Sequence, residues 1–258
     1  MTGNQTPSEQ NRVLEKPAKK VAIFSDIHGN YHALEAVMEA IQEEEVDMMV
    51  CCGDVVGYGA RPNDCVNTIR EHDIPVIAGN HDHACLLLTD ISNFNDIAKA
   101  AVIWTRDVLS EDNSAFLRKM PLTLEDKANN VFYVHASPKD PEEWNYILTM
   151  GEARTNFNYF KEQICFIGHS HQPFIIENEG GNLMCPSRPE VELKDDRRYL
   201  VNVGSVGQPR DHNPDACFVI LDFENKKLRI RRLKYDLEGA QKAIIDAGLR
   251  RELAERLS

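Results

Sequence analysis

The chain has 258 residues, enough for one large α/β domain or two small ones, and its 41 acidic and 29 basic residues give a formal net charge of −12. Such an excess of negative charge repels polyanions at long range, so it argues against nonspecific binding of nucleic acid or of an anionic membrane surface. A small phosphorylated substrate stays compatible with this charge if a local positive centre exists.

The cysteines and the N-terminal segment indicate a cytoplasmic protein. The seven cysteines are odd in number and contain no CxxC pair, which suits neither a disulfide framework nor a structural zinc site. No stretch approaches the roughly 18 apolar residues of a membrane helix. Residues 1–18 are polar and lack the apolar core of a secretion signal, so we expect a disordered tail followed by a single domain over 19–258.

From Val21 onward, short apolar runs alternate with amphipathic segments, which is typical of a buried sheet covered by helices. Strands are expected at 21–24, 48–52, 75–78, 131–134 and 164–167. Leu34, Val37 and Ile41 repeat at helical spacing, and a second helix is expected over about 63–71. These segments predict βαβ units.

Later segments depart from this alternation. Residues 84–119 predict a helical insertion, for which core packing is favoured over a mobile lid. Residues 178–196 are rich in Gly, Pro and charge and are expected to be an exposed loop. The runs at 199–203, 217–223 and 228–233 predict a β meander. Residues 236–257 predict a helix pair whose apolar stripe packs on the core or on a second subunit, which leaves a homo-oligomer open.

Potential metal ligands follow the predicted strands directly. Three apolar runs end in a glycine that precedes a ligand type, at Gly53-Asp54, Gly79-Asn80 and Gly168-His169. Glycine allows a sharp turn and a close approach, so each ligand is expected at the carboxyl end of its strand, where open α/β sheets bind ligands.

Two strands end in ligand types that are two residues apart. The pairs are Asp26-x-His28 and His169-x-His171, and His135 ends a further run. In an extended chain, residues i and i+2 point to the same side, so each pair can aim at one centre. The full set contains two carboxylates, one amide and four imidazoles: Asp26, His28, Asp54, Asn80, His135, His169 and His171.

Seven ligand types exceed what one zinc ion takes and suit two ions that share a bridging carboxylate. Nitrogen and oxygen ligation without thiolate fits Mn, Fe, Co, Ni or Zn, and the sequence does not choose among them. The positive charges of two divalent ions exceed the negative charges of two aspartates and one bridging hydroxide, which gives the site a formal charge of about +1. This is the local positive centre that a phosphate needs.

These blocks, in this order, resemble the pattern DxH…GD…GNH[DE]…H…GHxH of calcineurin-like metallophosphoesterases. They read Asp26-Ile27-His28, Gly53-Asp54, Gly79-Asn80-His81-Asp82, His135 and Gly168-His169-Ser170-His171, and the likeness covers residues 20 to about 235. Within that family, the run NVGSVGQPR at 202–210 makes the chain similar to the bacterial and archaeal phosphodiesterase-like branch.

The resemblance implies a four-layer α/β/β/α sandwich, in which two mixed β-sheets are flanked by helices. It also implies two divalent metal ions as cofactors. The ligands that it implies are Asp26, His28 and His171 for one ion, Asn80, His135 and His169 for the other, and Asp54 as the bridge between them.

Residues beside the ligands are candidates for catalysis and substrate binding. His81 directly follows a ligand and is expected to act as general acid on the leaving oxygen. Asp82 either orients that imidazole or caps a helix. Arg210 could clamp a phosphate oxygen or simply lie at the surface, and Tyr58 could stack on the substrate.

The leading hypothesis is dinuclear-metal-dependent hydrolysis of a small, nucleotide-like phosphoester by a phosphodiesterase or a phosphatase, with manganese as the first ion to test. The alternatives are a dinucleoside-polyphosphate hydrolase and a protein phosphatase. The latter is disfavoured because Gly53-Asp54-Val55-Val56-Gly57 lacks the arginine of the GDxVDRG pattern. A non-enzymatic scaffold would need neither the ligands nor His81, and a nuclease should display a basic groove.

Overall fold

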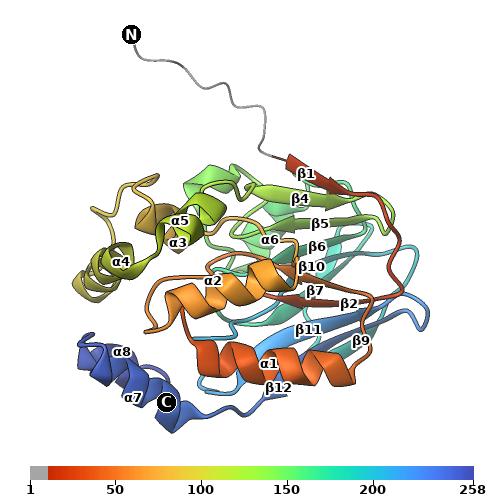
Figure 1. The fold of residues 1–258 in the computed structure, drawn as a ribbon. Coiled ribbons are helices and arrows are strands. Elements are labelled where there is room, and N and C mark those ends of the chain that lie inside the picture. Colours follow the sequence, from red (N-terminus) through yellow and green to blue (C-terminus); the bar gives the residue numbers. More distant parts are fainter. Residues whose placement is uncertain (1–10) are drawn as a thin grey trace.

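A computed structural model of the protein describes residues 11–258, which form two β-sheets with helices beside them (Figure 1). The larger sheet contains β1 (Asn11–Leu14), β4 (Thr123–Asp126), β5 (Val131–Val134), β6 (Ile164–Ile167), β7 (Phe174–Glu179), β8 (Asn182–Met184) and β10 (Arg198–Asn202). The smaller sheet contains β2 (Lys20–Phe24), β3 (Met48–Cys51), β9 (Glu190–Glu192), β11 (Ala216–Asp222) and β12 (Lys227–Leu233). The helices are α1 (Tyr31–Glu43), α2 (Pro62–Glu71), α3 (Asn80–Cys85), α4 (Asp96–Val108), α5 (Glu111–Leu117), α6 (Met150–Asn156), α7 (Leu237–Asp246) and α8 (Arg251–Glu255), with a 3₁₀ turn at Pro141–Glu143.

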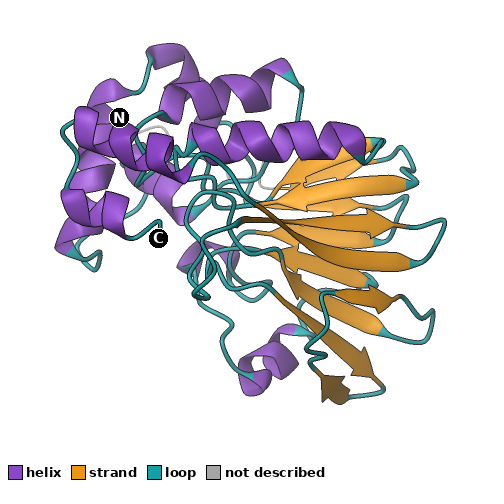
Figure 2. Ribbon diagram, turned by 90° about the horizontal axis from the view of Figure 1, so that it is seen from below, coloured by secondary structure: helices purple, strands orange, loops and turns teal. Residues whose placement is uncertain are grey.

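Both sheets mix parallel and antiparallel pairs, as the resemblance implied. The strand order is β1-β4-β5-β6-β10-β7-β8 in the larger sheet and β3-β2-β11-β12-β9 in the smaller one. Strand β2 runs parallel to β3 and antiparallel to β11, and β10 runs parallel to β6 and antiparallel to β7. Figure 2 shows the strands gathered on one side and most helices on the other.

Fully apolar strands explain the four layers, because successive side chains of a strand point to opposite faces. In β2, Val21 and Ile23 pack between the sheets in one cluster with Phe166 of β6. Ala22 and Phe24 point the other way, into a cluster that includes residues of α1 and α2. On the far side, alternate residues of β6 pack in a cluster with Ala153 of α6 and with Phe157, which follows it. The predicted α/β/β/α sandwich is therefore confirmed.

The N-terminal boundary and one predicted strand need correction. Residues 11–14, expected in the disordered tail over 1–18, form β1 and pair in parallel with β4, while the rest of that tail up to residue 10 lies outside the described part. The predicted strand at 75–78 forms a single bridge, between Cys51 and Val76. Pro75 has no amide hydrogen, and the Ala78 amide donates instead to Pro121 O, so the ladder does not extend.

The late part of the chain also differs from the prediction. The expected exposed loop at 178–196 contains the hairpin β7–β8, which turns at Gly180 and Gly181, and the strand β9. The three runs predicted as one meander belong to two sheets, because β10 pairs with β6 and β7 whereas β11 and β12 form a hairpin in the smaller sheet. The loop after Asn202 carries the chain from one sheet to the other.

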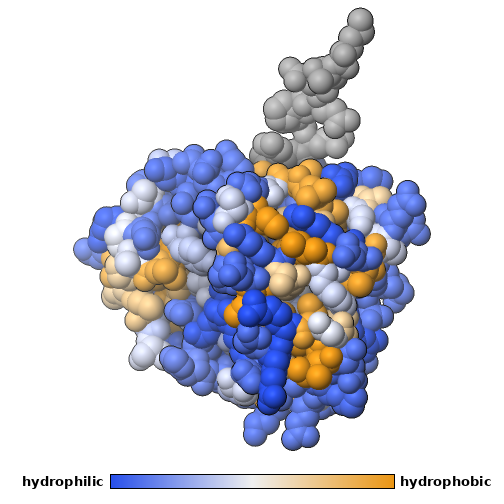
Figure 3. All heavy atoms as spheres, turned by 90° about the vertical axis from the view of Figure 1, so that its left-hand side faces the viewer, coloured by the Kyte–Doolittle hydropathy of each residue, from blue (hydrophilic) through white to orange (hydrophobic). Residues whose placement is uncertain are grey.

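Helices α4 and α5 lie in the region of the predicted insertion. Leu117 of α5 packs in the cluster that includes α1 and α2, whereas α4 joins the C-terminal helices in a separate apolar cluster. Ala98 and Ala101 of α4 share that cluster with Ile244 of α7 and Leu253 of α8. The C-terminal stripe thus packs within the same chain, although Ile245 is 48% exposed. On this helical face, mostly hydrophilic residues surround separate apolar patches (Figure 3). None of the helices between residues 11 and 258 is long and apolar enough to cross a bilayer.

Candidate metal centre

Loops from both sheets bring the predicted ligands together. The smaller sheet supplies Asp26 and His28 after β2 and Asp54 after β3, and the larger sheet supplies His135 after β5 and a histidine pair after β6. Two buried groups of three could each hold an ion, with their candidate ligand atoms within 4.8 Å of one another. The first group is Asp26, His28 and His171, and the second is Asp54, His135 and His169.

Asp54 lies between the two groups. Its Oδ2 is 3.3 Å from Nε2 of His135 in its own group and 3.6 Å from Nε2 of His28 in the other. Oδ1 of Asn80 lies 3.3 Å from His135 Nε2, which adds the amide to the second group. This arrangement matches the predicted ligand sets, with Asp54 in the position of a bridge.

The donor atoms themselves fit metal ions. Asp26 Oδ1 and His169 Nε2 are buried and, among the described residues, have no hydrogen-bond partner. Leaving a buried polar atom unsatisfied costs about 1–3 kcal/mol. Nε2 of His28 also lies only 3.0 Å from Nε2 of His171, so two ring nitrogens converge on one point. A bound cation would satisfy these lone pairs, and nitrogen and oxygen donors suit a divalent transition metal.

Backbone carbonyls orient three of the imidazoles. The Nδ1 atoms of His28, His135 and His171 lie 3.2 Å from Val56 O, 2.7 Å from Cys52 O and 2.5 Å from Gln208 O, respectively. A carbonyl can only accept, so each Nδ1 carries a proton, and Nε2 is the atom whose lone pair faces the centre when the ring is neutral.

The backbone at the ligands is unusual. Five of the ligand candidates have left-handed φ angles, at 55° for Asp26, 51° for His28, 53° for Asp54, 66° for His169 and 59° for His171. Each such non-glycine residue costs about 1–3 kcal/mol, and strain of this kind clusters at functional sites. The expectation that each i, i+2 pair aims at one centre from extended chain is therefore wrong in its backbone geometry, because the pairs lie in tight loops beyond the strand ends. Asp26 and His28 do share one group, whereas His169 and His171 belong to different groups.

Two glycines permit the close approach that was expected from the sequence. A Cβ atom at Gly79 would lie 2.1 Å from Asp54 Oδ1, and one at Gly168 would lie 2.4 Å from Asp26 Oδ2. No side chain fits at these distances. Both glycines therefore make room for the carboxylates of the centre.

Burial and charge set the protonation of the ligands. Burial lowers the pKa of His169 to about 3 and that of His171 to about 4. Burial would also lower the pKa of His135, but the charge of Asp54 outweighs it and raises that pKa to about 9. Despite their burial, Asp26 and Asp54 have lowered pKa values, because histidines surround them. Most of the ligands are thus ready for a metal at neutral pH, whereas His135 would release a proton on binding it.

His81 lies beside the ligands, 5% exposed, with its Nδ1 atom unpartnered among the described residues. Its ring centre is 4.9 Å from that of His28 and 5.1 Å from that of Phe94, and its amide donates to Asp54 Oδ1 at 2.8 Å. Burial lowers the pKa of His81 well below the usual value. The imidazole is therefore neutral at pH 7 when no substrate is bound.

Asp82 forms no hydrogen bond with Nδ1 of the His81 ring. Its Oδ2 accepts hydrogen bonds from the amides of Asp54 (2.8 Å) and Gly79 (3.0 Å), and its Oδ1 accepts one from the amide of Val56 (3.1 Å). Burial and the nearby charge of Asp54 raise the pKa of Asp82 to about 7. Of the two predicted roles, these contacts fit the cap, because Asp82 ties the start of α3 to the loop after β3.

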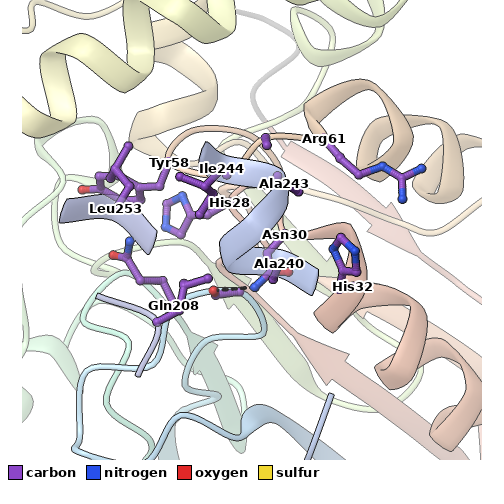
Figure 4. A pocket seen from close by; sticks show the side chains of 15 residues that line it. His28, Asn30, His32, Tyr58, Arg61, Gln208, Ala240, Ala243, Ile244 and Leu253 are labelled. Carbon is purple, nitrogen blue, oxygen red and sulfur yellow. Dashed lines mark hydrogen bonds between the residues drawn. The ribbon is translucent and has the colours of Figure 1, made fainter. Parts of the chain in front are cut away.

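Tyr58 and Arg210 form a supporting layer. The Tyr58 ring, 7% exposed, lies 4.5 Å from that of His81 and 4.7 Å from that of His28, and the Arg210 guanidinium donates to its hydroxyl at 3.4 Å. Figure 4 shows a small pocket in which Tyr58, His28 and Gln208 meet side chains of α7 and α8. The Tyr58 ring packs on these imidazoles and also lines a second cavity beside the centre, so its stacking on a substrate stays a prediction.

A cavity of about 490 Å³ opens beside the centre, and we call it the substrate cavity. Its buried lining residues, which mark its inner end, include Tyr58, Asn80, His81 and His169. Its side walls include three aromatic residues that were not predicted from the sequence: Phe94, Trp144 and Tyr146. The only available signal was the Trp144-x-Tyr146 pair soon after His135, in a segment without periodicity or ligand types.

Comparisons with known proteins agree with this geometry. Residues 20–226 match the calcineurin-like phosphoesterase superfamily domain. An uncharacterized protein of Methanocaldococcus jannaschii is 39% identical over 239 residues, which are 92% of this chain and 96% of that protein. The structure of a metallophosphoesterase from Sphaerobacter thermophilus is 33% identical, with a TM-score of 0.81 over 93% of this chain and 98% of that one. A hypothetical protein of Pyrococcus horikoshii, 22% identical, shares the fold with a TM-score of 0.74 over 92% and 97% of the two chains. The chain therefore belongs to the calcineurin-like phosphoesterase superfamily, a family of dinuclear-metal-dependent phosphoester hydrolases.

Proposed function

We propose that the protein hydrolyses a small phosphodiester with two divalent metal ions. The observation that carries this proposal is the pair of buried three-residue groups on either side of Asp54, next to the substrate cavity. Asp26, His28 and His171 would hold one ion, and His135, His169 and Asn80 the other, with Asp54 shared. Bound ions would supply a water that is activated near neutral pH and would neutralise the charge of the phosphoryl oxygens.

The chain itself would orient the substrate and move a proton. His81 lines the substrate cavity with an unpartnered Nδ1. Burial holds the pKa of His81 low, but an anionic phosphoryl group nearby would raise that pKa. His81 would therefore become protonated when substrate is bound and could donate this proton to the leaving oxygen.

The surroundings favour a phosphodiester over a phosphomonoester. None of the residues that line the substrate cavity is a lysine or an arginine, so no cationic side chain there helps the metal ions to compensate the second negative charge of a monoester. The half-buried Arg210 donates hydrogen bonds to Tyr58 and to Gln208, so it would influence a bound substrate through the Tyr58 ring and not by direct contact. A dinucleoside-polyphosphate hydrolase or a protein phosphatase would need to accommodate still more negative charge or a protein chain.

Two further expectations belong to this proposal. We propose Mn²⁺ as the first ion to test, because the donor set of nitrogen and oxygen atoms accepts it. We also propose a cytoplasmic location, because all seven cysteines are free and six of them are buried.

The direct test is metal-dependent turnover of matched chromogenic esters. The protein would be stripped with chelator, reloaded with Mn²⁺, and assayed with p-nitrophenyl phosphate and bis(p-nitrophenyl) phosphate. We expect metal-dependent hydrolysis that favours the diester. His135→Ala should lose bound metal and turnover together, whereas the exposed control His72→Ala should keep both. A wild-type protein that binds no metal, or one that binds two ions and cleaves neither ester, would contradict the proposal.

A further inference from the structure

The outer part of the substrate cavity is acidic. Asp90, Glu142 and Glu143 line it and are exposed. Asp90 accepts hydrogen bonds from Ser92, while neither glutamate forms an ion pair within the described part of the chain. Carboxylates without cations at the entrance to a site for an anion would oppose a substrate with further negative charge.

Aromatic rings lie beside these carboxylates. Tyr146 stacks on His169 with ring centres 4.0 Å apart and remains 48% exposed, so part of the ring stays accessible. Trp144 meets His135 edge-on at 5.9 Å, and Phe94 lies 5.1 Å from His81. Each ring therefore contacts a histidine of the centre and also lines the cavity. Aromatic faces near carboxylates attract organic cations.

The segment that carries these groups has a defined conformation. The 3₁₀ turn Pro141–Glu143 lies between Asp140 and Trp144, which both have left-handed backbone, with φ of 49° and 55°. This turn presents the two glutamates and Trp144 to the same cavity.

The inner end of the cavity fixes where the phosphoryl group would lie. His81 Nδ1 and His169 Nε2 belong to side chains that are 5% and 6% exposed, and both atoms lack a hydrogen-bond partner among the described residues. Both side chains line the substrate cavity. A phosphodiester held at that end would extend one of its alcohols toward the acidic and aromatic outer part.

We propose that one alcohol of the substrate carries an organic cation, a substituted ammonium group, which lies against Trp144 and Tyr146 and faces Glu142 and Glu143. This inference rests on the proposed function, since it assumes a phosphodiester at the metal centre. A nucleoside would gain stacking on the rings but no attraction from the carboxylates, and a polyphosphate chain would be repelled by them.

The test compares three diesters that release the same p-nitrophenol from the Mn²⁺-loaded protein. They are p-nitrophenylphosphocholine, which is cationic in its second alcohol, bis(p-nitrophenyl) phosphate, which is neutral there, and the p-nitrophenyl ester of thymidine 5′-phosphate. We expect kcat/KM for the choline ester to exceed that for the thymidine ester by about tenfold. The double variant Glu142→Gln/Glu143→Gln should lower the ratio of choline ester to neutral ester by about tenfold, mainly through KM.

A matched control removes two glutamates elsewhere. Glu71→Gln/Glu238→Gln neutralises the same formal charge at exposed positions on α2 and α7 and should leave the ratio unchanged. Hydrolysis of the neutral ester without preference for the choline ester, or an equal change in both double variants, would overturn this inference and leave the proposed function intact. Failure to cleave any ester with both metals bound would overturn both.

Discussion

Replacing Asp82 by asparagine should weaken the fold around the metal centre without acting on the proton transfer directly. The Asp82 carboxylate is fully buried and accepts hydrogen bonds from the amides of Gly79, Asp54 and Val56. Asparagine has the same shape but replaces one oxygen with an NH₂ group, so at least one of these amides would lose its acceptor. An unsatisfied buried donor costs about 1–3 kcal/mol. That is a large share of the 5–15 kcal/mol by which domains are typically stable.

Urea unfolding of the metal-loaded proteins would measure this loss as a fall in the unfolding midpoint at constant slope. The exposed Asp107 on α4 provides the control, because Asp107→Asn should change stability by less than about 0.5 kcal/mol. Metal content should fall with Asp82→Asn, since the Asp54 loop loses a support, and excess metal should restore part of the turnover. Wild-type stability and metal content combined with a large loss of kcat would refute this reasoning and return Asp82 to a catalytic role beside His81.

Further predictions follow from the same contacts. Gly79→Ala should lower the metal content, because its Cβ would lie 2.1 Å from Asp54 Oδ1. The control Gly151→Ala should keep the metal, because its Cβ meets only Thr149 Oγ1, at 3.8 Å. Equal metal content of the two variants after dialysis would count against the bridging position of Asp54. His81→Gln should lower kcat by about 100-fold or more with unchanged metal content, and parallel losses would assign His81 to metal binding. Metal-free protein should lose stability from pH 6.5 to pH 5, since the three site histidines with lowered pKa values stay neutral in the folded state while their unfolded forms take up protons. His169 and His171 would each cost about 2 kcal/mol at pH 5, and His81 would add to this loss. The raised pKa values of His135 and of the buried Asp82 carboxyl offset this loss only in part; a thermal midpoint that rises on acidification would contradict this balance.

The sequence could predict the ligand set because local signals marked it. Each ligand type follows an apolar run, often through a glycine, and a chain that leaves the end of a buried strand reaches the same edge of the sheet as its neighbours. Gly79 and Gly168 were informative because only glycine leaves room for the carboxylates of Asp54 and Asp26. The left-handed backbone of the ligands themselves was not predictable, since Asp and His fit both extended and tight conformations.

Features that depend on contacts between segments far apart in the chain were not predicted from the sequence, or were predicted at the wrong place. Strand β10 has the apolar pattern of a meander strand, yet its partner β6 lies some thirty residues earlier in the chain. Phe94 and Tyr146 come from segments without periodicity and reach one cavity only because the fold brings both against histidines of the centre. The sequence left the two roles of Asp82 open for a related reason, because its backbone partners at Asp54 and Val56 belong to another loop.

Each of the two three-residue groups draws on both sheets, and this has a consequence for the lifetime of the protein. Asp26 and His28 meet His171 from the other sheet, and Asp54 meets His135 and His169. An ion in either group would connect the loops of one sheet to those of the other. A free ion concentration of 100 times the dissociation constant stabilises the folded protein by about 2.7 kcal/mol. A cell that runs short of the metal would therefore lose more than turnover, because chains without ions would open more often at the loop end and be degraded sooner.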